Sequence, residues 1–358
     1  MPITEERSTE FVSIMRSIET RLLEKLPETQ NEVLRRLCSE HPRVLAGYAG
    51  QGPLACREDA ANHVEYLAAA VGFGEATPFL DYLRWLADVW HARELPLEGL
   101  ETTLRVLREY YAGLPETWAG EAVRHLDAGL AELGLRGEFL IPAGQDRGRL
   151  PATGAMLEAL LAGDRHLARA VAGNVLAAGC SLAQLGARLI QPSMYEIGAL
   201  WQKNRISVAQ EHLATAITQY VLAQAFAGAE ALARTQRRAL FANVETNHHA
   251  LGLRLVADVF DLAGWSIQYL GADVPTRALL EQVDTWGPEL LGLSVSMPQQ
   301  FAHVRAAIGA LRAEFGSRCP TLMLGGQVLN RYDRAADRLG ADLHVRDAMA
   351  ADDLAREQ

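Results

Sequence analysis

A histidine, a residue type that binds metals, lies between an apolar run typical of a strand and a pattern typical of a helix. Residues Asn247–Gly252 read Asn-His-His-Ala-Leu-Gly, between a predicted strand, Arg238–Val244, and a predicted helix, Ala250–Leu262. A loop in this position lies at the carboxyl edge of a sheet, where open α/β folds bind ligands. A neutral imidazole is a good metal ligand, and Gly252 lets the backbone approach a bound molecule. The segment indicates a ligand site with His249 as a metal ligand.

Small and polar residues end two later strands of the same predicted sheet. Ser294 and Ser296 close one apolar run, and Gly325 and Gly326 follow another. Because the carboxyl ends of parallel strands share one edge, we expect these residues to line a slot beside His249. An isolated loop histidine more often has no function than a ligand role. The assignment of His249 therefore depends on this slot.

Asn247 stands two residues before His249 and can accept a hydrogen bond from the far nitrogen of its ring. Such a partner fixes the orientation of a metal-binding imidazole. An asparagine cannot exchange a proton with the ring at neutral pH, as an aspartate can. We therefore expect Asn247 to orient His249 without assisting proton transfer.

The periodicity of apolar residues divides the chain into four segments. Residues 1–136 predict an all-helical domain, 137–154 a linker rich in Gly and Pro, and 155–237 a second helical region. Short connections in that second region favour an antiparallel four-helix bundle. Residues 238–358 alternate strands and helices, which predicts a doubly wound, Rossmann-like parallel sheet. The expected fold class is therefore α plus α/β.

Local signals place the elements inside these segments. Asp164 and Ser181 are candidate helix N-caps, and Ser207 with Gln210 has the spacing of a capping box. The candidate strands are Leu240–Val244, Ser266–Leu270, Leu290–Val295, Thr321–Leu324 and Leu343–Val345.

The composition excludes several classes of function. The 358 residues are 49% hydrophobic and carry a formal net charge of −10, with scattered arginines. A nucleic-acid surface needs clustered basic residues, so direct nucleic-acid binding is not expected. The four cysteines lack zinc-ligand spacing, and Leu213–Ala231, which resembles a membrane span, contains Gln219, Gln224 and Glu230. We expect a cytoplasmic protein with no membrane partner.

Residues 238–358 resemble the cobalamin-binding domain shared by cobalamin-dependent mutases, methionine synthases and cobalamin photoreceptors. The family pattern Asp-x-His-x-x-Gly, Ser-x-Leu and Gly-Gly stands here as Asn247-x-His249-x-x-Gly252, Ser294-Val-Ser296 and Gly325-Gly326. Tyr269–Pro275 matches the second strand and turn. The resemblance implies base-off cobalamin, with its dimethylbenzimidazole tail in the slot and His249 on cobalt. The implied cofactor-binding residues are Asn247, His248, Gly252, Ser294, Ser296, Gly325 and Gly326.

Asn247 departs from the aspartate of the family pattern. Methyl-transfer members use the carboxylate–histidine pair to manage changes of cobalt ligation. Its absence favours a protein that holds cobalt over one that cycles it.

Residues 193–215 resemble the helical cap of CarH-type cobalamin photoreceptors. There, a tryptophan followed ten residues later by Glu-His packs against the 5′-deoxyadenosyl group. Trp201, Glu211 and His212 would cover the upper face of adenosylcobalamin in this way. The alternative is a buried tryptophan with a helix-surface acid–base pair. Gln202 stands where such proteins often carry a second cobalt-binding histidine, and His212 is a candidate substitute.

The N-terminal segment lacks the basic recognition helix of CarH-type repressors and is rich in aromatic residues. This layout is similar to photocobilins, which combine the cobalamin module with biliverdin. The alternative is an ordinary helical core. The residues of the predicted bilin pocket are His63, Tyr66, Tyr82, Arg84 and Trp85.

These features predict a light sensor rather than an enzyme. Photolysis of adenosylcobalamin would change conformation or oligomeric state, with output through self-association or a downstream signalling protein. The alternative is a corrinoid methyl-carrier protein that serves a separate methyltransferase. A cobalamin-dependent mutase would need a (β/α)8 substrate barrel, and the sequence has no such repeat.

Overall fold

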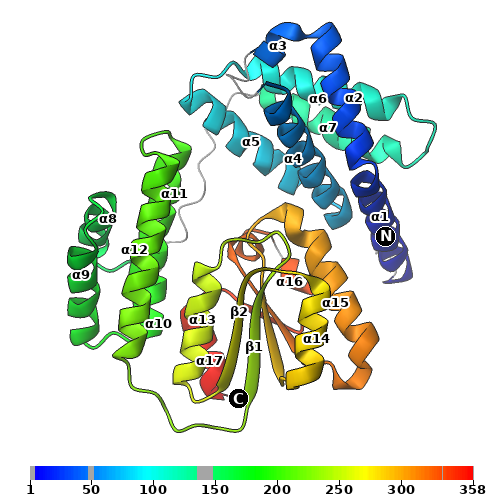
Figure 1. Cartoon of the computed structure of the whole chain (residues 1–358). Helices are drawn as coiled ribbons and strands as arrows, with labels where there is room; N and C mark the ends of the chain where they lie inside the picture. Colours follow the sequence, from blue (N-terminus) through cyan, green and yellow to red (C-terminus); the bar gives the residue numbers. More distant parts are fainter. Residues whose placement is uncertain (1–4, 47–51, 135–147, 333, 358) are drawn as a thin grey trace. The chain divides into compact units, whose positions relative to one another are not determined.

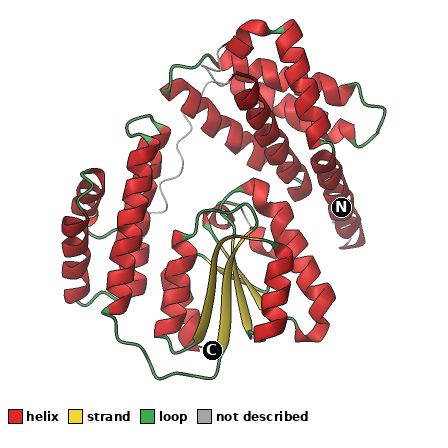
Figure 2. Ribbon diagram, viewed as in Figure 1, coloured by secondary structure: helices red, strands yellow, loops and turns green. Residues whose placement is uncertain are grey.

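The computed structural model describes residues 5–46, 52–134, 148–332 and 334–357. Contacts divide the chain into two compact units, Met1–Ile141 and Pro142–Gln358. Figure 1 traces both units by sequence colour, and Figure 2 separates helices from strands. The predicted domain boundary at residue 136 and most of the predicted linker lie outside the described residues. Of its described part, residues 148–152 are not helical, whereas Thr153 and Gly154 already belong to the first helix of the second unit, so the linker ends two residues before its predicted end.

Helices are the regular secondary structure of the described residues of the first unit, as the sequence predicts. Met15, Ile18 and Leu22 recur at three- and four-residue spacing and are buried against α4, which also packs on α2, α5 and α7. Its helices are α1 (Glu5–Glu24), α2 (Leu26–Glu40), α3 (Pro42–Ala46), α4 (Gly52–Phe73), α5 (Thr77–Ala92), α6 (Leu97–Ala112) and α7 (Ala119–Gly134).

The second unit begins with a helical bundle. Its elements are α8 (Thr153–Leu161), α9 (Arg165–Ala177), α10 (Leu182–Leu185), the π-helical turn η1 (Gly186–Ile190), α11 (Gln191–Gln202) and α12 (Val208–Ala227). Helices α8, α9, α11 and α12 pack on one another as the expected four-helix bundle. Asp164 accepts hydrogen bonds from two main-chain N–H groups of α9, and Ser181 and Ser207 head complete capping boxes. The predicted helix starts are confirmed.

A five-stranded parallel sheet follows in the order β2-β1-β3-β4-β5. The order reverses between β1 and β3, which makes the carboxyl edge there a topological switch point. The strands are β1 (Arg238–Val244), β2 (Ser266–Val274), β3 (Leu290–Ser294), β4 (Thr321–Gly325) and β5 (Leu343–Val345). The larger helices are α13 (Leu251–Leu262), α14 (Thr276–Trp286), α15 (Phe301–Phe315), α16 (Ala335–Leu339) and α17 (Ala348–Glu357). The Rossmann-like sheet predicted from the sequence is confirmed.

The bundle and the sheet share one apolar seam. Leu255 and Val259 of α13 and Ala348 of α17 belong to the same buried cluster as the bundle core. Gly186 lies so close to α13 that a Cβ there would stand 2.0 Å from Leu255 Cδ2. This contact therefore fixes where η1 rests on the sheet's covering helices.

Among the described helices, none is long and apolar enough to cross a membrane.

Candidate functional site

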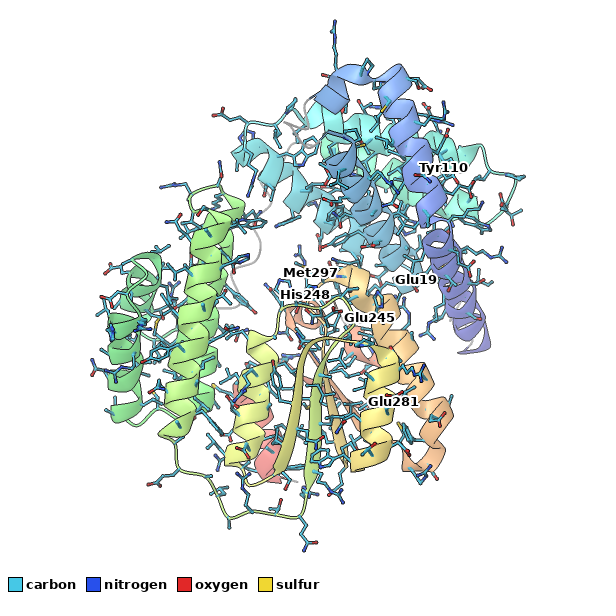
Figure 3. All side chains as sticks on the ribbon, viewed as in Figure 1. Glu19, Tyr110, Glu245, His248, Glu281 and Met297 are labelled. Carbon is cyan, nitrogen blue, oxygen red and sulfur yellow. The ribbon has the colours of Figure 1, made fainter. Side chains whose placement is uncertain are left out.

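The loop between β1 and α13 (residues 245–250) lies at the carboxyl edge of the sheet, where Figure 3 labels Glu245 and His248. Thr246 adopts a left-handed backbone with φ of 67°. Its N–H donates to Asp273 Oδ1 at 2.7 Å, and the Asp273 N–H donates to Asn247 O at 3.1 Å. The end of β2 therefore fixes the path of the histidine-bearing loop.

Asn247 is fully buried and connects this loop to β3. Its Nδ2 donates to Ser294 O at 2.9 Å, and its Oδ1 accepts from the His249 N–H at 3.1 Å. The predicted hydrogen bond to the His249 ring is not formed in the described structure. Buried main-chain groups need partners, and the Asn247 amide satisfies two of them. Asn247 thus positions the backbone of His249 instead of its ring.

His249 presents an accessible imidazole at this edge. Nearby protein atoms still limit hydration of the ring, and this lowers its pKa below the ordinary value. The Glu211 carboxylate acts in the opposite direction, and His248 lowers the pKa further. The ring is therefore neutral at neutral pH, with a nitrogen lone pair for a metal.

Glu211 is the carboxylate of the bundle whose charge acts on His249. Glu211 lies in the first turn of α12, where its Oε1 accepts from Thr215 Oγ1 at 2.9 Å. Its Oε2 lies 2.6 Å from Nδ1 of the exposed His212. Trp201 is half-buried near the end of α11 and packs against the bundle core, while Gln202 is buried. The structure thus places Glu211 within electrostatic reach of His249.

Gln300 was not identified from the sequence, although it ties two loops of the site together. Its buried Oε1 accepts from the N–H groups of Ser296 and Met297 at 2.8 and 3.1 Å. Its Nε2 donates to Thr246 O at 3.2 Å. Met297 stands where a capping box has Ser or Thr, so the sequence gives no capping signal for this glutamine.

The glycine pair after β4 has a requirement of its own. Gly326 has a φ of 125°, and a Cβ there would stand 1.8 Å from Val295 O. The Val295 N–H donates to Gly325 O at 3.0 Å. The pair lets the β4 loop cross the end of β3 at main-chain distance, beside Ser294.

Gly252 differs from this pair. A Cβ at Gly252 would meet no atom within 4 Å, so the first turn of α13 faces open space. That space is what a ligand approaching this backbone needs.

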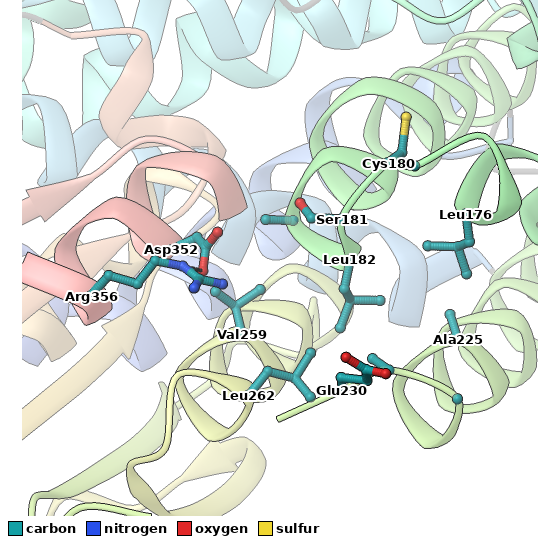
Figure 4. Close-up of a pocket in the computed structure, with 14 residues that line it drawn as sticks. Leu176, Cys180, Ser181, Leu182, Ala225, Glu230, Val259, Leu262, Asp352 and Arg356 are labelled. Atoms are coloured by element: carbon teal, nitrogen blue, oxygen red, sulfur yellow. Dashed lines mark hydrogen bonds and ion pairs between the residues drawn. The ribbon is translucent and has the colours of Figure 1, made fainter. Parts of the chain in front are cut away.

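A pocket of about 440 Å³ opens elsewhere in this unit, and none of the predicted site residues lines it. Figure 4 shows Leu182, Val259, Leu262 and the Asp352–Arg356 pair around it. Val259 and Leu262 lie in the last turns of α13, towards the amino ends of the strands. The pocket is therefore distinct from the histidine site.

The residues of the predicted bilin pocket are only partly brought together in the first unit. The Tyr82 hydroxyl lies 2.8 Å from His63 Nδ1, and the Tyr66 and Tyr82 rings stack at 3.8 Å. The Trp85 ring lies 6.3 Å from Tyr82. Arg84 instead pairs with Glu132 and Asp81 at 2.6 and 3.1 Å. Its charge therefore serves contacts between helices.

These aromatic side chains pack in the hydrophobic core of the first unit. His63 is 1% exposed, and its Nε2 has no hydrogen-bond partner. Burial lowers the pKa of His63 to about 4. The ring is therefore uncharged at neutral pH.

Gly326→Ala is expected to destabilise the protein by at least about 2 kcal/mol, because the backbone is left-handed and Val295 O blocks the new methyl group. Gly252→Ala is the matched control. It meets no atom and gains helix propensity, so its unfolding free energy should stay within about 1 kcal/mol of wild type. Urea unfolding followed by circular dichroism measures both. Equal effects would contradict this account of the glycines.

Asn247→Asp is expected to lower the unfolding free energy at neutral pH by about 1–3 kcal/mol. A carboxylate oxygen would replace the amide that donates to Ser294 O, and the new charge would be buried. Asn62→Asp, exposed on α4, is the control and should change stability by less than about 0.5 kcal/mol. If the Asn247→Asp variant were as stable as wild type, the Asn247 amide would not be needed as a hydrogen-bond donor.

The buried His63 should make stability fall with acidity. Its folded pKa of about 4 lies below its ordinary value of 6.5, so below pH 6.5 the unfolded chain binds a proton that the folded chain excludes. The stability present above pH 6.5 is lost as the pH falls towards 4, by up to about 3 kcal/mol for this histidine. His125, also lowered to about 4, acts in the same direction. Urea unfolding across this range should show a shallower pH dependence for His63→Asn; an unchanged slope would exclude the role of His63.

Two family models match the second unit. Residues 237–351 match a B12 binding domain, which covers the sheet. Residues 154–225 match a second B12 binding domain model, which covers the bundle.

Curated relatives cover the same part of the chain. Dimethylamine corrinoid protein 2 of Methanosarcina acetivorans is 26% identical over 170 residues, 46% of this chain and 76% of the relative. The HTH-type transcriptional repressor CarA of Myxococcus xanthus is 34% identical over 155 residues, 42% of this chain. The chain spans about half, 49%, of the CarA length.

Among solved structures, the monomethylamine corrinoid protein of Methanosarcina barkeri aligns with a TM-score of 0.49 and 21% identity, over 56% of this chain and 95% of that one. The family matches and the curated relatives together support a cobalamin-binding protein, with both B12 binding domain matches in the second unit.

Proposed function

We propose that this cobalamin-binding protein holds adenosylcobalamin and responds to light. The observation that carries the proposal is that one compact unit contains both the histidine loop and the Trp201–Glu211–His212 set. Glu211 of that set lies close enough to shift the pKa of His249. This supports a site in which the histidine loop and the bundle contribute to the two faces of one cofactor.

The lower side of the site fits a corrinoid. A corrin ring supplies four nitrogen ligands to its cobalt, so a single imidazole completes that side. His249 is neutral and accessible, and the first turn of α13 leaves space at Gly252. In this proposal His249 binds cobalt, and the nucleotide tail enters the slot near Ser294, Ser296 and the glycine pair.

The upper side would be formed by the bundle. Adenosylcobalamin supplies a cobalt–carbon bond that visible light cleaves. Trp201 offers an aromatic wall, and Glu211, held by Thr215 and His212, offers a carboxylate to the hydroxyls of the adenosyl group. Loss of those contacts in the light would shift the bundle towards another packing or oligomeric state.

The role of Asn247 favours holding cobalt over cycling it. Both polar atoms of its amide are engaged by the main chain at Ser294 and His249. The loop therefore has no carboxylate at this position to exchange a proton with the imidazole. We propose a regulatory protein without catalytic turnover, acting in the cytoplasm through self-association or a downstream signalling protein.

We also propose biliverdin as a second chromophore of the first unit. The support is the aromatic group formed by His63, Tyr66, Tyr82 and Trp85, in which the buried His63 Nε2 lacks a hydrogen-bond partner. Arg84 is not part of this proposal because it pairs with Asp81 and Glu132. Protein produced with biliverdin should absorb in the red, and His63→Asn should shift that band. Absence of a red band would leave the aromatic group as core packing.

A methyl-carrier function is the second candidate. It is favoured by the curated relatives named dimethylamine and trimethylamine corrinoid proteins. It predicts a stable methylcobalamin form and methyl transfer with a separate methyltransferase. It also predicts no change of size in light.

Light-dependent spectroscopy and gel filtration separate the two candidates. Wild-type protein loaded with adenosylcobalamin in the dark should show the absorption spectrum of adenosylcobalamin with a nitrogen ligand on the lower side of cobalt. Green light should convert that spectrum and shift the elution volume. Trp201→Ala should bind the cofactor and convert in light with a reduced change of elution volume, since its wall against the adenosyl group is removed.

Methylcobalamin-loaded protein is the matched control for contacts to the adenosyl group. Its elution volume in the dark should match that of the illuminated adenosylcobalamin form. An elution volume of the adenosylcobalamin form that is indifferent to light would contradict the light-sensor proposal and favour the methyl carrier.

A further inference from the structure

Asn243 is a fully buried amide on an apolar face of the sheet. It is the sixth residue of β1, and the residues two and four positions earlier, Phe241 and Ala239, pack in the core between the sheet and α13. Because side chains alternate along a strand, Asn243 faces the same side. A polar side chain there needs an explanation, because Ala239 and Phe241 on the same face of β1 are apolar.

The neighbours of Asn243 form a row at the carboxyl edge. Asn243 pairs in register with Ser294 of β3, and Ser294 pairs with Gly325 of β4. We call these three residues the edge row. Ser294 and Gly325 are residues of the predicted slot for the nucleotide tail. Asn243, which the sequence pattern did not single out, extends that slot onto β1.

One atom of the Asn243 amide is left without a partner. Nδ2 donates to Asn247 O at 3.2 Å, whereas Oδ1 is buried and accepts no hydrogen bond. The amide cannot turn round, because Oδ1 would then face the carbonyl oxygen of Asn247. The free group is therefore an acceptor in a fixed direction, and a buried acceptor without a donor destabilises the fold.

The next inward-facing residues towards the amino ends of the strands, below the edge row, offer no hydrogen-bond donor. Gly292 pairs with Phe241 there, and a Cβ at Gly292 would stand 2.5 Å from the Phe241 ring and 3.1 Å from Met323 Cε. An aromatic ring and a thioether line this part of the slot, which suits an apolar base. A hydrogen-bond donor of the ligand must therefore lie nearer the edge of the sheet, beside Asn243.

We propose that Asn243 Oδ1 accepts a hydrogen bond from a sugar hydroxyl of the corrinoid nucleotide tail and selects corrinoids that carry this tail. The dimethylbenzimidazole base has no N–H or O–H when it is off the cobalt, so the ribose is the donor at this level. This inference rests on the proposed binding of base-off cobalamin. It adds a specificity-determining residue on β1.

The test compares two ligands on two variants of the full chain. Cobalamin carries the nucleotide tail, and cobinamide has the same corrin ring without it. Asn243→Leu keeps the volume and removes the acceptor, and Asn247 O keeps its bond from the Asp273 N–H. Cobalamin should bind Asn243→Leu about tenfold more weakly than wild type, while cobinamide binding stays within about twofold. Asn243→Thr, which retains an acceptor oxygen, should lose less than Asn243→Leu.

Stability of the ligand-free protein supplies a second readout. Asn243→Leu should unfold at the same or higher urea concentration than wild type, because a buried unpaired acceptor is removed. Equal losses for cobalamin and cobinamide, equal losses for the two variants, or unchanged cobalamin binding by Asn243→Leu would each overturn the inference. If wild type itself binds neither ligand, the proposed cobalamin function fails, which is a separate result.

Discussion

The site depends on the two hydrogen bonds of the buried Asn247 amide. One joins the β1 loop to Ser294 O on β3, and the other fixes the main chain of His249. Strands β1 and β3 lie on either side of the switch point of the sheet. The loop that follows β1 at this point therefore depends on side-chain hydrogen bonds for its position. Gln300 adds a second link between the same loops. The position of the imidazole therefore follows from main-chain geometry, and its neutrality from partial desolvation.

The second requirement is that the bundle stays placed against the sheet. Leu255 and Val259 enter the bundle core, and Gly186 allows η1 to approach α13 closely. Because this seam is apolar and tight, it sets where Glu211 stands relative to His249. In the proposed function, a cofactor bound between Glu211 and His249 would contact both the bundle and the sheet. A change in its upper ligand would then alter the packing of the bundle along this seam.

The sequence predicted the elements well because their signals are local. Capping residues at Asp164, Ser181 and Ser207 define helix starts through bonds within one turn. The five strands lie between helical patterns, and each formed at its expected place, although β2 continues to Val274, beyond its predicted end at Leu270. The roles of Asn247, Gln300 and Asn243 were not predictable in this way. Their partners lie on other strands and loops, so only the folded register of β1, β3 and β4 reveals them.

Direct detection of the cobalt ligand tests the central claim. Reduced, cobalt(II)-loaded protein gives an electron paramagnetic resonance spectrum in which the axial nitrogen splits each cobalt line into a triplet. Protein labelled with ¹⁵N-histidine and loaded with unlabelled cobalamin should give doublets, and His249→Ala should lose the doublet pattern. Triplets that persist in the labelled protein would show that the cofactor's own base remains on cobalt. That result would contradict the assignment of His249.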